Sequence, residues 1–195
     1  MECQPEDEQD QKPKQPRQKW DDYFYDIAKK VALRSHDDSK VGAVLVRELD
    51  NEHIIIATGY NGFPRNVIDD PSRFGDKEKL CWTVHAEINT LCNAARVGVS
   101  TNRTTIYVTK FPCSQCAGAL IQFGIRRVYT LGKAWEKDPN GDKGERSFRM
   151  LAEAGVITYA PKIEMKLILE EERVKSADTN GAKSNGHKKT KPVSK

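Results

Sequence analysis

The feature that most limits the fold of this chain is an alternation of short apolar runs with segments of helical periodicity. Runs rich in β-branched residues are typical of buried strands, whereas apolar residues three and four apart are typical of helices that cover a sheet. Strands are expected at 41–46, 53–59, 104–109, 126–131 and 156–161, and helices at 20–32, 85–95, 113–124, 145–155 and 163–175. This order predicts an α/β fold, a three-layer α/β/α sandwich around a mixed five-stranded sheet.

The connections between these elements fall into two kinds. The segment 47–52, "RELDNE", is polar and is expected to be a turn between the first two strands. The segment 60–84 is expected to be a long loop before the second helix. Glycines close the helices 113–124 and 145–155, as is common at helix C-termini.

The pattern gives one domain, 20–174, between an N-terminal arm, 1–19, and a C-terminal tail, 175–195, that are both expected to be disordered. The tail holds six lysines and one aspartate, and the arm five acidic and four basic residues, so none of the net charge of +4 falls on the domain. A neutral domain is not typical of proteins that bind the phosphate backbone of nucleic acids. The tail, which contains "HKKTKP", is more simply a solvated segment than a targeting or anion-binding patch.

The expected location follows from features that the sequence lacks. No apolar run approaches the roughly 18 residues of a membrane span, and the first 19 residues lack the apolar region of a signal peptide. The five cysteines are an odd number, which argues against a disulfide framework and for a reducing compartment. We therefore expect a cytoplasmic protein without a membrane partner, and the basic tail leaves a nuclear location open.

Chemically active side chains stand at the starts of two expected helices. His85 and Glu87 lie two residues apart at one start, and Cys113 and Cys116 lie three apart at the other. A spacing of three puts both thiols on one face of a helical turn. Helix N-termini carry partial positive charge, which favours thiolate over thiol.

One imidazole and two thiolates make three protein ligands for a metal ion. Structural zinc sites are normally closed by four ligands, whereas three leave a position for water, as in catalytic sites. Bound zinc lowers the pKa of such a water to about 7. His85, Cys113 and Cys116 are therefore predicted to hold Zn²⁺, and Glu87 is predicted to transfer protons beside it.

Each motif alone has other interpretations. A Cys-x-x-Cys pair is also found in redox proteins, where it follows the first strand of a thioredoxin-like unit, but here it comes late in the chain. Cys81, four residues before His85, would be needed to close a structural zinc site. His-x-Glu followed by Pro-Cys-x-x-Cys is the signature of zinc-dependent deaminases, which favours the catalytic interpretation.

The same residues carry a resemblance to a known family. "HAEINT" with "PCSQC" resembles the cytidine deaminase superfamily, and "GYNGFP" (59–64), "WDDYFYDIAKKVALRS" (20–35), "VGAVLV" and "AGVITYAP" resemble its deoxycytidylate (dCMP) deaminases. The resemblance covers about residues 20 to 165. It implies hydrolysis of dCMP to dUMP and ammonia, with His85, Cys113 and Cys116 on zinc and Glu87 as proton shuttle. It also implies that Asn61 contacts the sugar and that the main-chain amide of Ala86 binds the pyrimidine carbonyl.

Recognition of the phosphate is less well defined. Lys133 resembles the lysine that these enzymes carry in an Asp-Lys-Tyr segment, and Lys40 is a second candidate, although either lysine would also be an ordinary surface charge. Here the segment is Gly132 to Trp135, so dCTP, deoxycytidine or a modified cytosine nucleotide are alternative substrates. Trp135 is a candidate to stack on the base, or else an ordinary core residue. "CAGALIQFGIRRVYTL" also resembles tRNA adenosine deaminases, but the neutral domain offers no RNA-binding face.

Regulation is a further implication of the resemblance. Such enzymes are commonly homohexamers that dCTP activates and dTTP inhibits, with a regulatory site near the loop after Gly-Tyr-Asn-Gly. Here that loop, 63–79, offers Arg65 and Arg73 to a triphosphate and Asp69 and Asp70 to its Mg²⁺, unless it is only a flexible surface loop. The alternative outside enzymes is a zinc-binding interaction module that acts through the basic tail, which would have no use for Glu87.

Overall fold

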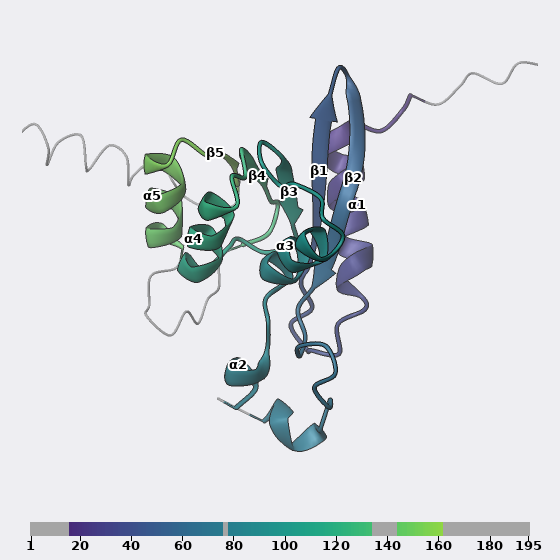
Figure 1. Cartoon of the computed structure of the whole chain (residues 1–195), viewed down its shortest axis with the longest axis vertical. Helices are drawn as coiled ribbons and strands as arrows, with labels where there is room; N and C mark the ends of the chain where they lie inside the picture. The colour runs from purple at the N-terminus through teal and green to yellow at the C-terminus, as the bar shows by residue number, and fades with distance from the viewer. Residues whose placement is uncertain (1–15, 76–77, 134–143, 162–195) are drawn as a thin grey trace, which may run out of the picture.

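The computed structural model describes residues 16–75, 78–133 and 144–161, which form one five-stranded sheet with helices on both faces (Figure 1). The strands are β1 (Gly42–Leu49), β2 (Glu52–Tyr60), β3 (Thr105–Val108), β4 (Arg127–Tyr129) and β5 (Ile157–Tyr159). The helices are α1 (Trp20–Ala32), the 3₁₀ helix η1 (Pro71–Phe74), α2 (Glu78–Trp82), α3 (Ala86–Arg96), α4 (Ser114–Gln122) and α5 (Glu145–Glu153).

The sheet is mixed, as the sequence predicts. Its order is β2-β1-β3-β4-β5, with β1 antiparallel to both β2 and β3, and with β3, β4 and β5 parallel to one another. The carboxyl ends of β2, β3 and β4 therefore lie at the same edge as the start of β1. This is the edge at which open α/β sheets bind their ligands.

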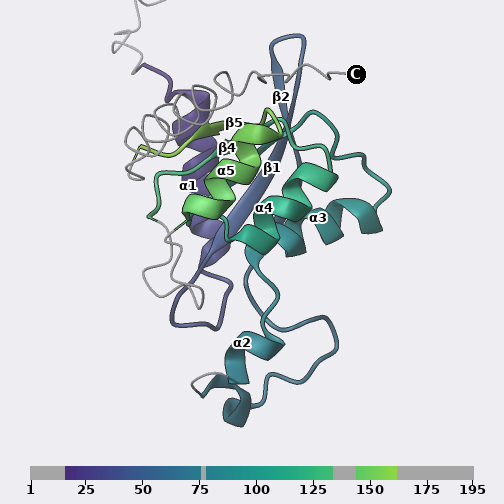
Figure 2. The same ribbon diagram turned by 90° about the vertical axis from the view of Figure 1, so that its left-hand side faces the viewer.

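Helix α1 covers one face of the sheet and α3, α4 and α5 cover the other (Figure 2). A hydrophobic cluster lies under the helices of each face, which confirms the three layers. On one face, Phe24 and Ala28 of α1 pack against side chains of β1, β3 and β4. On the other face, α3, α4 and α5 contribute Leu91, Leu120 and Leu151 to the larger cluster. The helix expected at 163–175 lies outside the described residues, as do the tail and most of the arm, so the domain boundaries stay predictions.

The prediction of a turn at 47–52 is wrong in extent. β1 and β2 continue to Leu49 and from Glu52, with Arg47 paired to Ile54, and only Asp50 and Asn51 form the turn. Both turn residues have positive φ, 44° and 70°, as a two-residue hairpin turn of the common type requires. The extension pairs Arg47, Glu48 and Leu49 with residues 54, 53 and 52. These segments are largely polar and partly exposed, so their sequence resembles that of a turn.

The prediction of a loop at 60–84 is also wrong in part, because this segment contains η1 and α2. Residues 62–75 and 78–84, which we name the lobe, project from the edge of the sheet (Figure 1). Backbone hydrogen bonds in both directions between Gly62 and Val84, 3.1 and 2.8 Å long, close its base. Among the described residues, no helix is both long and apolar enough to cross a membrane.

Candidate metal centre and active site

The start of α3 carries two of the predicted site residues. His85 is the N-cap and Glu87 lies in the first turn. The helix reaches its position because Gly59 of β2 has no side chain: a Cβ there would lie 2.5 Å from the Thr90 nitrogen and 2.8 Å from the Ala86 oxygen. The close approach of α3 to β2 thus fixes where the imidazole and the carboxylate stand.

The start of α4 carries the two thiols. Cys113 is the N-cap and Cys116 follows in the first turn, so both lie at the positive end of the helix dipole. Phe111, two residues earlier, is 1% exposed and belongs to the larger hydrophobic cluster. Its amide donates to the carbonyl of Lys133, 3.2 Å away, which ties the loop before α4 to the end of β4.

The two helix starts bring His85, Cys113 and Cys116 together, with ligand atoms that all lie within 4.8 Å of one another. His85 Nδ1 is 3.3 Å from Cys116 Sγ and 3.5 Å from Cys113 Sγ. Zn–N and Zn–S bonds of about 2.0 and 2.3 Å at tetrahedral angles would separate nitrogen from sulfur by about 3.5 Å. The donor set and its spacing therefore fit one zinc ion, with Nδ1 as the imidazole ligand.

Hydrogen bonds among these groups shift their pKa values. The hydrogen bond from Cys116 lowers the pKa of Cys113 to about 4, and the same contact raises the pKa of Cys116. The hydrogen bond to Cys113 raises the pKa of His85, against the opposing effect of burial. A metal ion between the two sulfurs would favour the loss of both thiol protons.

Glu87 lies in the same place but has a different environment. Its side chain is only 3% exposed. Burial raises the pKa of its carboxyl group, although His85 and a hydrogen bond with Cys116 act in the opposite direction. A buried carboxyl group beside a metal site is suited to hold and release a proton near neutral pH.

Cys81 does not join this cluster. Among the residues that the structure describes, the metal-binding group consists of His85, Cys113 and Cys116, while Cys81 is exposed in α2. A closed four-ligand site with Cys81 therefore gains no support from the geometry. Cys92, on α3, is also exposed and lies outside the cluster.

Two asparagines that sequence reasoning missed hold α3 against β2. Asn89 Nδ2 donates to the carbonyl of Tyr60 at 2.8 Å, and Asn93 Nδ2 donates to that of Thr58 at 2.7 Å. β2 is an edge strand of the sheet, so on its outer side these side chains bond main-chain acceptors that no neighbouring strand reaches. Their spacing of four along a helix is the only sequence signal, and it is equally typical of a solvated face.

The predicted substrate-binding residues that the structure describes lie at the ligand-binding edge of the sheet. Asn61 is 4% exposed; its Oδ1 accepts from the Val41 amide at 2.7 Å, and its Nδ2 donates to the Ser39 carbonyl at 3.0 Å. Ala86 is buried in the first turn of α3, where main-chain amides have no partner within the helix. Lys40 and Lys133 are exposed. Trp135 lies outside the described residues.

The four residues predicted to regulate the protein belong to the lobe, where each makes contacts of its own. Arg65 donates to Asn93 on α3, and Asp69 lies 3.1 Å from His36. Asp70 caps η1 by accepting from the Ser72 amide at 2.9 Å, which lowers the pKa of its carboxyl group.

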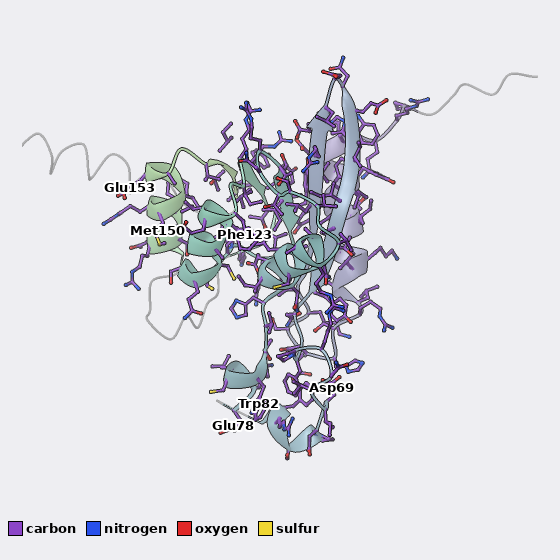
Figure 3. All side chains as sticks on the ribbon, viewed as in Figure 1. Asp69, Glu78, Trp82, Phe123, Met150 and Glu153 are labelled. Carbon is purple, nitrogen blue, oxygen red and sulfur yellow. The ribbon has the colours of Figure 1, made fainter. Side chains whose placement is uncertain are left out.

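Arg73, the fourth, lies over the ring of Trp82 at 4.2 Å from its centroid. Figure 3 shows Asp69, Glu78 and Trp82 grouped in the lobe, away from the sheet. A pocket between the lobe and the α1–β1 loop is lined by Arg34, His36, Tyr60, Asn61, Asp69 and Phe74, among others, and by none of the metal-site residues.

Comparisons with known proteins agree with this geometry. Residues 18–132 match the cytidine and deoxycytidylate deaminase zinc-binding region. The chain is 39% identical over 149 residues to a probable deoxycytidylate deaminase of Drosophila melanogaster, covering 70% of each chain. It is 32% identical over 166 residues to deoxycytidylate deaminase of Homo sapiens, covering 80% of this chain and 88% of that protein.

Solved structures also show the fold. The dCMP deaminase of cyanophage S-TIM5, in complex with dCMP and dUMP, superposes with a TM-score of 0.56 and 21% identity. The match covers 71% of this chain and 94% of the phage protein.

Proposed function

This chain belongs to the cytidine and deoxycytidylate deaminase family, and from that premise we propose that it hydrolyses dCMP to dUMP and ammonia. The observation that carries the proposal is the carboxyl group of Glu87, 3% exposed, beside one imidazole and two thiols at adjoining helix starts. The relatives named deoxycytidylate deaminase support dCMP as substrate.

His85 Nδ1, Cys113 Sγ and Cys116 Sγ are the atoms proposed to hold zinc. Their mutual distances and their positions at two helix N-termini support this assignment. When bound, zinc supplies a water acidic enough to act as a nucleophile near neutral pH. Three protein ligands leave that position open.

Glu87 is proposed to move the protons. Its carboxylate takes a proton from the attacking water and gives it to N3 of the cytosine ring as the new C4–O bond forms. It then transfers the second proton of that water to the amino group, so that the C4–N bond breaks and ammonia leaves. The buried position and raised pKa of Glu87 support this role, because the same group must accept and donate in turn.

The substrate contacts are proposed from position. The Ala86 amide, in the first turn of α3, is available to the pyrimidine carbonyl. Asn61 is proposed to contact the sugar. Its Oδ1 accepts from Val41 and its Nδ2 donates to Ser39, and each atom can form a second hydrogen bond. Lys133, Lys40 and Trp135 keep their proposed contacts with phosphate and base. Because the thiols must stay reduced to bind metal, we also propose a cytoplasmic location.

The test is a panel of cytosine substrates with the zinc-loaded protein. Loss of cytosine absorbance is followed with dCMP, dCTP, deoxycytidine, cytidine and CMP at equal concentrations. We expect the highest kcat/KM with dCMP. A higher value with another member of the panel would replace the proposed substrate, and no turnover of any would contradict a cytosine deaminase.

We further propose that the enzyme is a homo-oligomer, a hexamer by resemblance, which dCTP with Mg²⁺ activates and dTTP inhibits through the lobe. Support comes from an ion pair between Lys79 and Asp37, 2.7 Å, which connects the lobe to the α1–β1 loop. Asp37 also accepts from the Ser39 amide at 2.8 Å. Ser39 in turn bonds Asn61, so a change in the lobe has contacts through which to reach the site.

Regulation of this kind predicts a sigmoidal rate against dCMP that becomes hyperbolic when dCTP and Mg²⁺ are added. The reason is that an activator must bind the active state more tightly than the inactive one. Initial rates with and without each effector, together with the molar mass from light scattering, check this. Hyperbolic kinetics without a response to dCTP or dTTP would contradict the regulation and leave the catalytic proposal intact.

A further inference from the structure

We infer that Lys110 binds the 5′-phosphate of the substrate and thereby makes the enzyme prefer a nucleotide over a nucleoside. The inference rests on the proposed function, because it assigns one contact to the substrate of the same site. It concerns a residue that lies just before the Pro-Cys-x-x-Cys motif, three positions ahead of Cys113.

The main chain holds Lys110 at the ligand-binding edge of the sheet. Val108, the last residue of β3, pairs with Ala43 of β1. Two further hydrogen bonds extend this pairing: the Thr109 amide donates to the Gly42 carbonyl at 3.0 Å, and the Gly42 amide donates to Thr109 Oγ1 at 3.1 Å. Lys110 therefore stands beside the start of β1 and leads into the loop that carries Cys113.

The side chain of Lys110 is half-buried and points toward the proposed sugar contact. Its Nζ lies 2.8 Å from Ser39 Oγ, and the Ser39 carbonyl accepts from Asn61 Nδ2 at 3.0 Å. The ammonium group is thus separated from Asn61 by a single residue. A nucleotide whose sugar lies at Asn61 would have its 5′ substituent within reach of this group.

The chemistry of the Lys110–Ser39 pair suits an anion. An ammonium group has only donors, so the serine oxygen must be the acceptor, and the serine hydroxyl hydrogen is left to donate to another group. A phosphate monoester with a charge near −2 would accept from both the lysine and the serine. The geometry of the pair is set before substrate arrives.

Two other lysines add to the positive charge at this edge. Lys40 follows Ser39 in the chain, and the carbonyl of Lys133 accepts from the Phe111 amide at 3.2 Å. Both lysines are exposed, whereas Lys110 is half-buried and fixed by a side-chain hydrogen bond. Water screens an exposed charge more strongly, so we assign the larger contribution to Lys110.

The test compares Lys110→Met with the wild-type enzyme on dCMP and on deoxycytidine. Loss of a charge-assisted hydrogen bond should lower kcat/KM for dCMP about 10- to 100-fold, through KM, and change it on deoxycytidine less than about threefold. Lys110→Arg should recover part of the loss because the charge returns. Lys30→Met, on the exposed surface of α1, is the matched control and should behave as wild type.

A purely structural role for Lys110 would lower activity on both substrates alike, and that result would overturn the inference, as would no effect on either. Calorimetric binding of dUMP and deoxyuridine separates this inference from the proposed function. If the wild-type protein binds dUMP more tightly and Lys110→Met loses that difference, the phosphate contact is supported even where no substrate is turned over. An equal affinity for dUMP in the two proteins would reject it.

Discussion

The two regions that carry the predicted functional residues are built in opposite ways. Around the starts of α3 and α4, Ala86, Glu87 and Cys116 are at most 3% exposed. In the lobe, η1 and α2 contribute no buried residue, and Ile68 and Leu80 are 74% and 60% exposed. The lobe is held by contacts among its own side chains and by a few contacts with the rest of the described domain, which we call the body.

This difference in burial separates the residues proposed for catalysis from the lobe proposed for regulation. The residues proposed for catalysis are held by the same packing that stabilises the fold, so their geometry is fixed whenever the protein is folded. The lobe adds little buried surface, and segments of this kind open or rearrange at a small cost in free energy. Changes at the metal centre should therefore have large effects on activity, and changes in the lobe small ones.

The largest effect is expected for Cys113→Ala. Loss of one of three protein ligands should reduce bound zinc from one ion per chain to a small fraction and abolish turnover. Metal analysis by mass spectrometry after dialysis measures the zinc content. Cys81→Ala, in the lobe, is the matched control and should keep both zinc and activity. Equal zinc content in the two variants would reject the proposed ligand set.

Glu87→Gln should have the next largest effect. The amide keeps the size of the side chain but cannot take a proton from water, so kcat should fall at least about 100-fold. Zinc content and the melting temperature should stay close to those of the wild type. Turnover near the wild-type rate, with zinc bound, would remove Glu87 from the mechanism.

The body could be predicted from the sequence because each of its elements repeats a pattern over several turns or residues. The periodicity of α1, the apolar runs of β1 to β5 and the motif at His85 and Cys113 are all local signals. Helix starts are marked by residue type and spacing, so the metal ligands could be assigned to the same kind of position. That is why the sheet agrees with the sequence analysis, and why the sequence could name His85, Cys113 and Cys116 as a group that the structure brings together.

The lobe could not be predicted in this way. α2 has five residues and η1 four, too few to show a period.

Contacts between distant parts of the chain could not be predicted either. The contacts of Asn89, Asn93 and Lys110 join residues 29, 35 and 71 positions apart, and a single sequence does not show which partners meet. The extension of β1 to Leu49 was hidden because its residues face solvent and lack an apolar run.

Two glycines allow the same substitution to be compared in the two regions. Gly59→Ala should destabilise the protein by about 1–3 kcal/mol, because the new Cβ would press on α3. Gly75→Ala, in the lobe, places its Cβ in open space at φ −75°. It should leave the free energy of unfolding unchanged or raise it by up to about 1 kcal/mol.

Urea unfolding of both variants, with zinc bound, measures these differences. The Gly59 variant should also lose activity, since His85 and Glu87 move with α3, whereas the Gly75 variant should not. Equal stability of the two variants would mean that α3 can shift away from β2 at no cost. The close packing would then not be what fixes the site.

The smallest effect is expected for Trp82→Leu in the lobe. Trp82 lies under Arg73, donates to Glu78 Oε2 at 3.2 Å and has its ring centroid 6.4 Å from that of Phe63. Its replacement therefore removes a cation–π contact worth about 0.5–1 kcal/mol, one exposed hydrogen bond and one ring contact. The lobe is joined to the body through its base at Gly62 and Val84, through the Lys79–Asp37 and Asp69–His36 pairs and through the hydrogen bond from Arg65 to Asn93, and Trp82 takes part in none of these contacts. Hydrogen exchange should therefore become faster in peptides from the lobe but not in peptides from α3, and kcat with dCMP should change less than about twofold. If exchange in α3 also became faster, or zinc were lost, the lobe and the metal centre would form one cooperative unit. The proposed independence of the catalytic residues from the lobe would then be wrong.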